Sequence, residues 1–159
     1  MFIGLSGNAV RVWSINMSHA RKQARKAVVQ ALYQWQMAAQ NISEIEGQFK
    51  DEYATSKMDF EYFSELLHAI PSNVSELDGL IKPCVDRTMD EVNPVELAIL
   101  RLATFELKNR LDIPYRVVIN EGVDLTKRFG ADKGHKFVNS VLDKLAKSLR
   151  EGEVAAKKK

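Results

Sequence analysis

The sequence has few of the residues that disulfide frameworks, metal sites and membrane spans require. Its 159 residues include one cysteine, Cys84, which excludes an intramolecular disulfide and is typical of a protein of the reducing cytoplasm. We interpret this cysteine as a small buried apolar side chain. His19, His68 and His135 are far apart and no CxxC pair occurs, so we expect no metal site. No apolar run approaches the roughly 20 residues of a membrane-spanning helix, so we expect no membrane span.

Motifs that mark enzymes are also missing. The sequence has neither a GxxxxGK[ST] nor a GxGxxG motif, and we interpret the turn at 130–134 as a helix stop. Pairs of acids such as Glu44 and Glu46 lie in an acidic stretch that is typical of a solvated surface. We therefore expect no catalysis and no cofactor.

The apolar residues, which make up 45% of the chain, recur with a helical period nearly everywhere. This pattern predicts an all-α domain of about seven helices over residues 18–150. Residues 1–17 show no period and lack the basic leader of a secretory signal, so we expect a disordered extension, with Met17 as the natural start. Residues 151–159 have no apolar face and should form a flexible basic tail.

Start and stop signals place the individual helices. The first is expected over about 18–40, with Ser18 as its cap, and a short weak helix follows in the acidic stretch. Pro71 interrupts the next apolar stripe, which is therefore either one kinked helix or two helices. The expected starts of the last three helices are Asn93-Pro94, Asp112-Ile113-Pro114 and Asp132.

The first helix carries a run of basic residues that no acid balances. Between residues 21 and 39 there is no Asp or Glu, and the cations begin the run at Arg21, Lys22, Arg25 and Lys26. Such a cluster suits a phosphate backbone, although the net charge of the chain is only +2. Tyr33 falls on the same side and suits base stacking or a protein partner. The alternative is a solvated basic face with an incidental tyrosine.

A second basic cluster surrounds the start of the last helix. It consists of Lys127, Arg128, Lys133, His135 and Lys136, followed by Phe137. Backbone N–H groups at a helix start attract anions, so phosphates could bind here with help from Lys133 and Lys136. Phe137 suits either base stacking or the core. If the two clusters meet in space, they form one strip suited to RNA.

Several segments resemble, in order, the NusB family of bacterial transcription antitermination factors. They are 31–36 (ALYQWQ), 77–83 (LDGLIKP), 95–103 (VELAILRLA), 113–115 (IPY), 118–121 (VINE), 129–131 (FGA), 135–139 (HKFVN) and 141–144 (VLDK). The resemblance implies an all-α fold of two packed helical subdomains without catalysis. It also implies a heterodimer with the ribosomal protein NusE, which binds single-stranded boxA RNA of ribosomal RNA leaders. This pair helps RNA polymerase read through terminators.

The resemblance also assigns roles to residues at matching positions. The RNA-binding residues that it implies are Arg21, Lys22, Arg25, Lys26, Gln30, Lys133, His135, Lys136 and Phe137. The partner-binding residues that it implies are Tyr33, Glu96 and Arg101. Arg101 interrupts an apolar helix, and an internal ion pair with Glu106 or Glu96 would explain it equally.

Two other functions remain as alternatives. Some RNA methyltransferases carry a NusB-like helical portion, but this chain shows no cofactor-binding domain. A helix-turn-helix DNA binder would place its basic residues on a helix after a tight turn, whereas these begin the first helix. A homodimer that buries the basic face is a further alternative.

Overall fold

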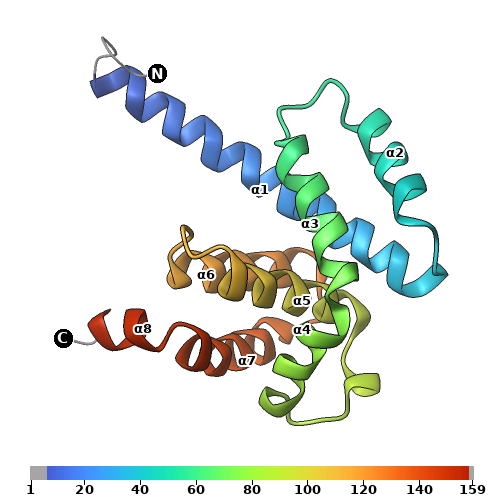
Figure 1. Cartoon of the computed structure of the whole chain (residues 1–159), viewed down its shortest axis with the longest axis vertical. Coiled ribbons are helices and arrows are strands. Elements are labelled where there is room, and N and C mark those ends of the chain that lie inside the picture. Colours follow the sequence, from blue (N-terminus) through green and yellow to red (C-terminus); the bar gives the residue numbers. More distant parts are fainter. Residues whose placement is uncertain (1–6, 158–159) are drawn as a thin grey trace.

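The computed structural model describes residues 7–157, and the side chains of residues 18–157 (Figure 1). Over these residues the chain is all-α, as predicted, with no strand. Its helices are α1 (Gly7–Ala38), α2 (Ile42–Glu52), α3 (Phe60–Ser72), α4 (Val74–Ile81), α5 (Pro94–Asn109), α6 (Tyr115–Phe129), α7 (Gly134–Leu149) and α8 (Glu151–Lys157). Short 3-10 turns at Lys82–Cys84 and Met89–Glu91 connect α4 to α5. None of the described helices is both long and apolar enough to span a membrane.

Of the predicted helix caps, only Asn93 is observed: Ser18 lies inside α1, and α7 begins at Gly134 without a side-chain cap. Asn93 accepts hydrogen bonds from the backbone N–H groups of Val95 (2.9 Å) and Glu96 (3.3 Å), so the predicted start of α5 is confirmed. The predicted start of α6 is confirmed in its position, but the predicted side-chain cap is not formed. Asp112 does not cap this helix, because its carboxylate faces Arg110 instead.

Pro71 leaves two separate helices, which decides between the two alternatives. α3 includes Pro71 in its last turn and ends at Ser72, and α4 begins at Val74. Asn73 stands between them, and its backbone N–H reaches the carbonyls of Ala69 and Ile70. The break therefore falls just after the proline, whose missing N–H cannot continue the helical hydrogen bonds.

Both ends of the chain are more helical than expected. α1 begins at Gly7 rather than near residue 18, so the backbone of 7–17, expected to be disordered, is helical. No proline interrupts this stretch, and extending a formed helix costs less than starting one. Figure 1 shows this end of α1 reaching beyond the other helices. Residues 1–6 lie outside the described residues, and the division of the chain at residue 17 stays a prediction.

The expected flexible tail is wrong over residues 151–157, which form α8. Glu153 holds this helix in place, because its carboxylate accepts the backbone N–H of Tyr115 at the start of α6 (2.8 Å). Arg150 donates to the same carboxylate (2.7 Å), and Val154 is buried. Tyr115, one of the partners of Glu153, comes from a helix far away in the sequence, so the local sequence of the tail did not reveal this contact.

The helices form two packed groups around α5. α1, α2 and α3 pack on one another, while α4, α6 and α7 pack around α5, and α1 and α3 also contact α5. These are the two subdomains that the family resemblance implies. α5 is central because apolar residues lie on all of its faces: Ala98, Ile99, Leu100, Leu102, Ala103, Phe105 and Leu107 are all buried. This packing brings the basic residues Lys22 and Lys26, in the middle of α1, close to α6.

Candidate nucleic-acid interface

The predicted RNA-binding residues of α1 differ widely in exposure. Lys22 and Gln30 are exposed, and the Arg21 and Lys26 side chains are half-buried. Arg25, in contrast, is only 4% exposed. The basic run therefore lies partly on the surface and partly in the core.

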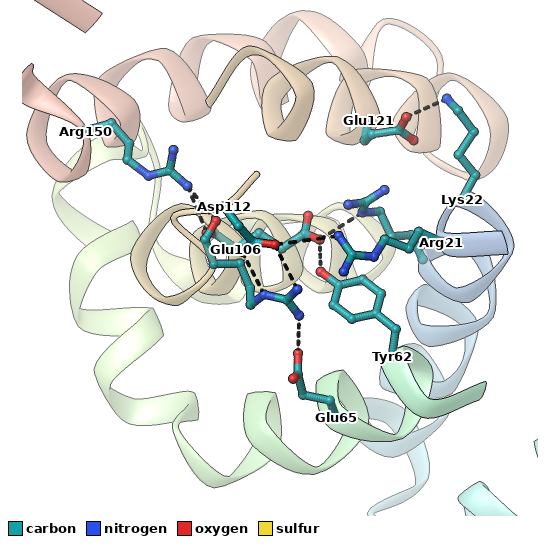
Figure 2. Close-up of polar contacts among 10 residues, drawn as sticks. Arg21, Lys22, Tyr62, Glu65, Glu106, Asp112, Glu121 and Arg150 are labelled. Atoms are coloured by element: carbon teal, nitrogen blue, oxygen red, sulfur yellow. Dashed lines mark hydrogen bonds and ion pairs between the residues drawn. The ribbon is translucent and has the colours of Figure 1, made fainter. Parts of the chain in front are cut away.

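Arg25 belongs to a buried ion pair with Glu106, so the structure does not place its side chain on the surface with the other predicted RNA-binding cations. Its Nε donates to Oε2 of Glu106 at 2.9 Å. The Tyr62 hydroxyl donates to the same oxygen (Figure 2). Burial alone would lower the pKa of Arg25, but the negative charge of Glu106 and its hydrogen bond outweigh burial and raise that pKa. Arg25 is thus a fixed cation whose role is to neutralise a buried carboxylate of α5.

Arg21 lies at the edge of this network. Its guanidinium stacks on the Tyr62 ring (4.9 Å to the centroid), and one terminal nitrogen lies 3.8 Å from the Asp112 carboxylate. The side chain keeps 29% exposure, so it can still face a ligand at the surface. Stacking limits its rotamers, which reduces the entropy lost when a phosphate binds.

Lys22 makes a surface ion pair with Glu121 of α6. The Lys22 ammonium lies 2.5 Å from Oε1 of Glu121, as Figure 2 shows. The lysine side chain is 45% exposed and that of Glu121 only 14%. A half-exposed pair of this kind contributes little to folding stability. The ammonium therefore remains accessible to a stronger anion.

The two basic clusters meet in part, between α1 and α6. A hollow of about 490 Å³ is lined by cations of both helices, Lys22 and Lys26 from α1 and Lys127 and Arg128 from α6. Glu121 and Asp124 also line it. Lys127 and Arg128 are both exposed. The first cluster thus joins the half of the second cluster that precedes Gly130.

The other half of the second cluster surrounds the start of α7. Lys133 and Lys136 are exposed and His135 is half-buried. Phe137 is also half-buried, and the guanidinium of Arg87 covers its ring at 3.9 Å from the centroid. A base can stack on Phe137 only where Arg87 leaves the ring open. The ring also packs against the core, which is one of its two suggested roles, and base stacking stays a prediction.

The backbone site expected at the start of α7 is already filled. Glu96 is 3% exposed, and its Oε2 accepts the backbone N–H of Ala131 at 3.1 Å. A Cβ added to Gly134 would lie 2.4 Å from the same oxygen, so this carboxylate sits directly against the first residue of α7. A phosphate cannot take this position while Glu96 occupies it. Lys133, whose φ of 64° turns the chain into the helix, stays outside.

The implied partner-binding residues also separate into surface and interior. Tyr33 is 40% exposed and lies near the exposed end of α1, where Met37 is 59% exposed. Glu96 is buried, so a partner cannot touch its carboxylate without rearrangement of the turn before α7. The sequence placed Glu96 correctly on α5 but could not indicate that it points inward.

Arg101 does form an internal ion pair, as one interpretation of the sequence predicted, but its partner differs from the two acids that were suggested. It forms a bidentate pair with Asp78 of α4 (2.9 and 2.7 Å) and donates to the side chain of Gln36 of α1 (2.9 Å). Neither Glu106 nor Glu96 takes part. Arg101 also lines a surface groove with Trp35 and Leu97, so a partner bound there could contact it.

Two arginines of the polar network were not anticipated from the sequence. Arg110 bridges Glu65 (2.6 Å) and Asp112 (3.0 Å), and these partners raise its pKa. Arg150, only 5% exposed, donates to the carbonyls of Leu107 and Arg110 at the end of α5. Basic residues suit a helix end because carbonyls there lack partners. The arginine that donates to the last carbonyls of α5 lies at the end of α7, and no local pattern in the sequence indicates this contact.

Among the described residues, no group of three or more His, Cys, Asp or Glu side chains is arranged to hold a metal ion. The geometry of the hollow instead presents cations with long, flexible side chains. It suits an anion that is recognised mainly by charge.

Comparison with known proteins agrees with this picture. The sequence matches the model of the NusB family over residues 22–147. The transcription antitermination protein NusB of Pseudomonas putida (strain W619) is 56% identical over 142 residues, covering 89% of this chain and 86% of that protein. The protein of the same name from Hahella chejuensis is 54% identical over 138 residues, covering 87% and 93%. These names are those of a transcription factor and not of an enzyme.

Solved structures show the same similarity. T. maritima NusB superposes with a TM-score of 0.70 at 32% identity, covering 80% of this chain and 90% of that chain. A crystal structure of the antitermination factors NusB and NusE in complex with dsRNA gives a TM-score of 0.73 at 30% identity, covering 82% and 98%.

Proposed function

Because this chain belongs to the NusB family, we propose that it binds single-stranded boxA RNA of ribosomal RNA leaders as a heterodimer with NusE. The pair joins the antitermination complex of RNA polymerase and helps it read through terminators. This function places the protein in the cytoplasm and requires no membrane, no cofactor and no catalysis. The related complex of NusB, NusE and dsRNA supports both the RNA and the NusE partner.

The observation that carries the proposal is a set of cations on α1 and at the start of α7 that the fold leaves available to a ligand. Within the described residues, Lys26, Lys133 and Lys136 form no ion pair, and the ion pair of Lys22 is half-exposed. A phosphate backbone supplies the missing negative charges, and each contact releases a counterion. Gln30 adds an exposed amide on the same helix, which suits a base edge or a sugar.

The proposed RNA site is therefore the one that the family resemblance implies, without Arg25. Arg21, Lys22, Lys26 and Gln30 contribute from α1, and Lys133, His135, Lys136 and Phe137 from α7. Charge supplies most of the affinity, and the half-buried Phe137 ring and the Gln30 amide supply sequence preference.

The proposed NusE surface includes Tyr33 and the exposed edge of Arg101. Arg101 lines a groove of about 460 Å³ together with Trp35, Met37 and Leu97. Aromatic and arginine side chains are typical anchors of protein interfaces. Glu96 is left out of this surface, because it is buried and its carboxylate accepts the backbone N–H of Ala131.

Fluorescence anisotropy of labelled boxA RNA, with and without NusE and over a salt series, tests the function. We expect tighter binding with NusE and a preference over a scrambled RNA. Replacing Lys22 and Lys26 by alanine should lower the salt slope by about 1.4, since each single-strand phosphate contact contributes roughly 0.7.

A matched variant with Lys50 and Lys57 replaced by alanine removes the same charge from the α2 side and should keep the wild-type slope. Equal, weak binding of boxA and scrambled RNA by the wild type with NusE would refute the function. Weak methyl transfer would instead favour the methyltransferase alternative, and equal affinity for duplex DNA the helix-turn-helix alternative. Light scattering of the free protein tests the homodimer.

A further inference from the structure

The hollow between α1 and α6 extends the basic surface beyond the residues assigned above. Lys127 and Arg128 occupy the last turn of α6 and line the hollow opposite Lys22 and Lys26. Within the described residues neither Lys127 nor Arg128 forms an ion pair. The hollow is wide enough for a phosphate group, with a volume of about 490 Å³.

Glu121 gives the hollow its own counter-ion. Its carboxylate, which is mostly buried, emerges from the second turn of α6 and holds the Lys22 ammonium at 2.5 Å. It does not form an ion pair with Lys26, Lys127 or Arg128 in the described part of the chain. A polyanion that enters the hollow must compete with Glu121 for Lys22 but meets the other three cations unpaired.

We propose that this hollow is a phosphate-backbone subsite in which Lys127 and Arg128 of α6 bind RNA together with Lys26, and Glu121 attenuates binding by holding Lys22. The proposal rests on the proposed RNA function and adds residues that the family resemblance did not assign. It accounts for the clustering of cations from two helices that are far apart in the sequence. The subsite binds the phosphate backbone through charge alone, so it contributes affinity rather than sequence preference.

A purely structural role for Lys127 and Arg128 makes a different prediction. Cations in the last turn of a helix stabilise it by offsetting the negative end of the helix dipole. Their replacement would then lower the free energy of unfolding but leave the salt dependence of RNA binding unchanged. The two roles are therefore separated by measuring urea unfolding and the salt slope on the same variants.

The experiment uses the full chain with NusE and labelled boxA RNA. We expect the variant with Lys127→Ala and Arg128→Ala to lose about 1.4 from the salt slope, as two lost single-strand phosphate contacts require. The Lys50→Ala and Lys57→Ala variant is the control of equal charge. If the variant with Lys127→Ala and Arg128→Ala kept the wild-type salt slope of RNA binding, the proposed subsite would be refuted. Because the wild type is measured beside it, absence of RNA binding by the wild type would instead refute the proposed function.

Glu121→Gln tests the attenuation, since the amide keeps the shape of the side chain and removes its charge. Freeing Lys22 should tighten RNA binding about two- to fivefold at low salt, the range expected for one surface ion pair. The gain should disappear when Lys22→Ala is combined with Glu121→Gln. Unchanged or weaker binding by Glu121→Gln with wild-type unfolding would overturn the role of Glu121.

Discussion

Replacing Arg25 by alanine should damage the fold and not the RNA contact. The change leaves the Glu106 carboxylate, 1% exposed, with the Tyr62 hydroxyl but without its cation. Removing one partner of a buried pair typically costs about 3–5 kcal/mol, because the remaining charge stays desolvated. A domain of this size has only about 5–15 kcal/mol in total, so the loss would be a large fraction of its stability.

Urea unfolding followed by far-UV circular dichroism measures this loss. Lys22→Ala, one turn earlier on α1, is the matched control and should cost less than about 1 kcal/mol, because its pair is half-exposed. Should Arg25→Ala fail to fold, Arg25→Lys keeps the charge but loses the geometry of the Nε bond, and we expect an intermediate loss.

A double variant isolates the charge. Arg25→Met with Glu106→Gln removes both charges and keeps most of the volume, so it should be more stable than Arg25→Ala. If Arg25→Ala had the same free energy of unfolding as Lys22→Ala, the reasoning from the buried pair would be refuted. A lower salt slope of RNA binding by the folded double variant, which lacks the positive charge of Arg25, would restore Arg25 to the RNA site.

Two further predictions concern packing and pH. Gly134→Ala should lower the free energy of unfolding, measured in urea, by about 1–3 kcal/mol, because its Cβ would displace the buried Glu96 carboxylate. Gly79→Ala is the control, since its Cβ would meet open space, and equal stability of the two variants would contradict this reasoning. The hydroxyl of Ser64, followed by His68, holds the pKa of Glu46 below its usual value against the effect of burial. The unfolded chain therefore binds more protons as the pH falls below about 4.5, and stability falls there. Urea unfolding between pH 7 and 3 should show a shallower fall for Glu46→Gln, and an identical fall would contradict the role of Glu46.

The helices of this protein follow largely from local patterns. Asn93 and the proline after it predict the start of α5, and the apolar residues that follow predict its central place. Pro71 predicts a break, and its position in the last turn of α3 decided between the alternatives. The prediction failed for α8, because Glu153 is held by Tyr115 from a helix far away in the sequence.

The candidate site was predicted less completely than the fold. Lys22 and Lys133 were placed correctly on the surface, and Lys26 is half-buried; an uncompensated run of cations is visible in the sequence. Glu96 and Arg25 were placed there as well, although both are buried. A charged residue that interrupts an otherwise apolar helix, as Glu106 does, was the available signal that a cation had to lie in the core.

The sequence by itself determined the all-α class, most helix starts and the presence of two basic clusters, because each depends on residues within a few turns of one another. Only the tertiary structure decided which cations face solvent and which face a carboxylate. Arg25 and Glu106 are 81 residues apart, and Lys22 and Glu121 are 99 apart. Two basic residues of the same helix therefore differ in exposure: Arg25 is buried in the core and Lys22 lies on the surface. Burial depends on what the fold places opposite each side chain.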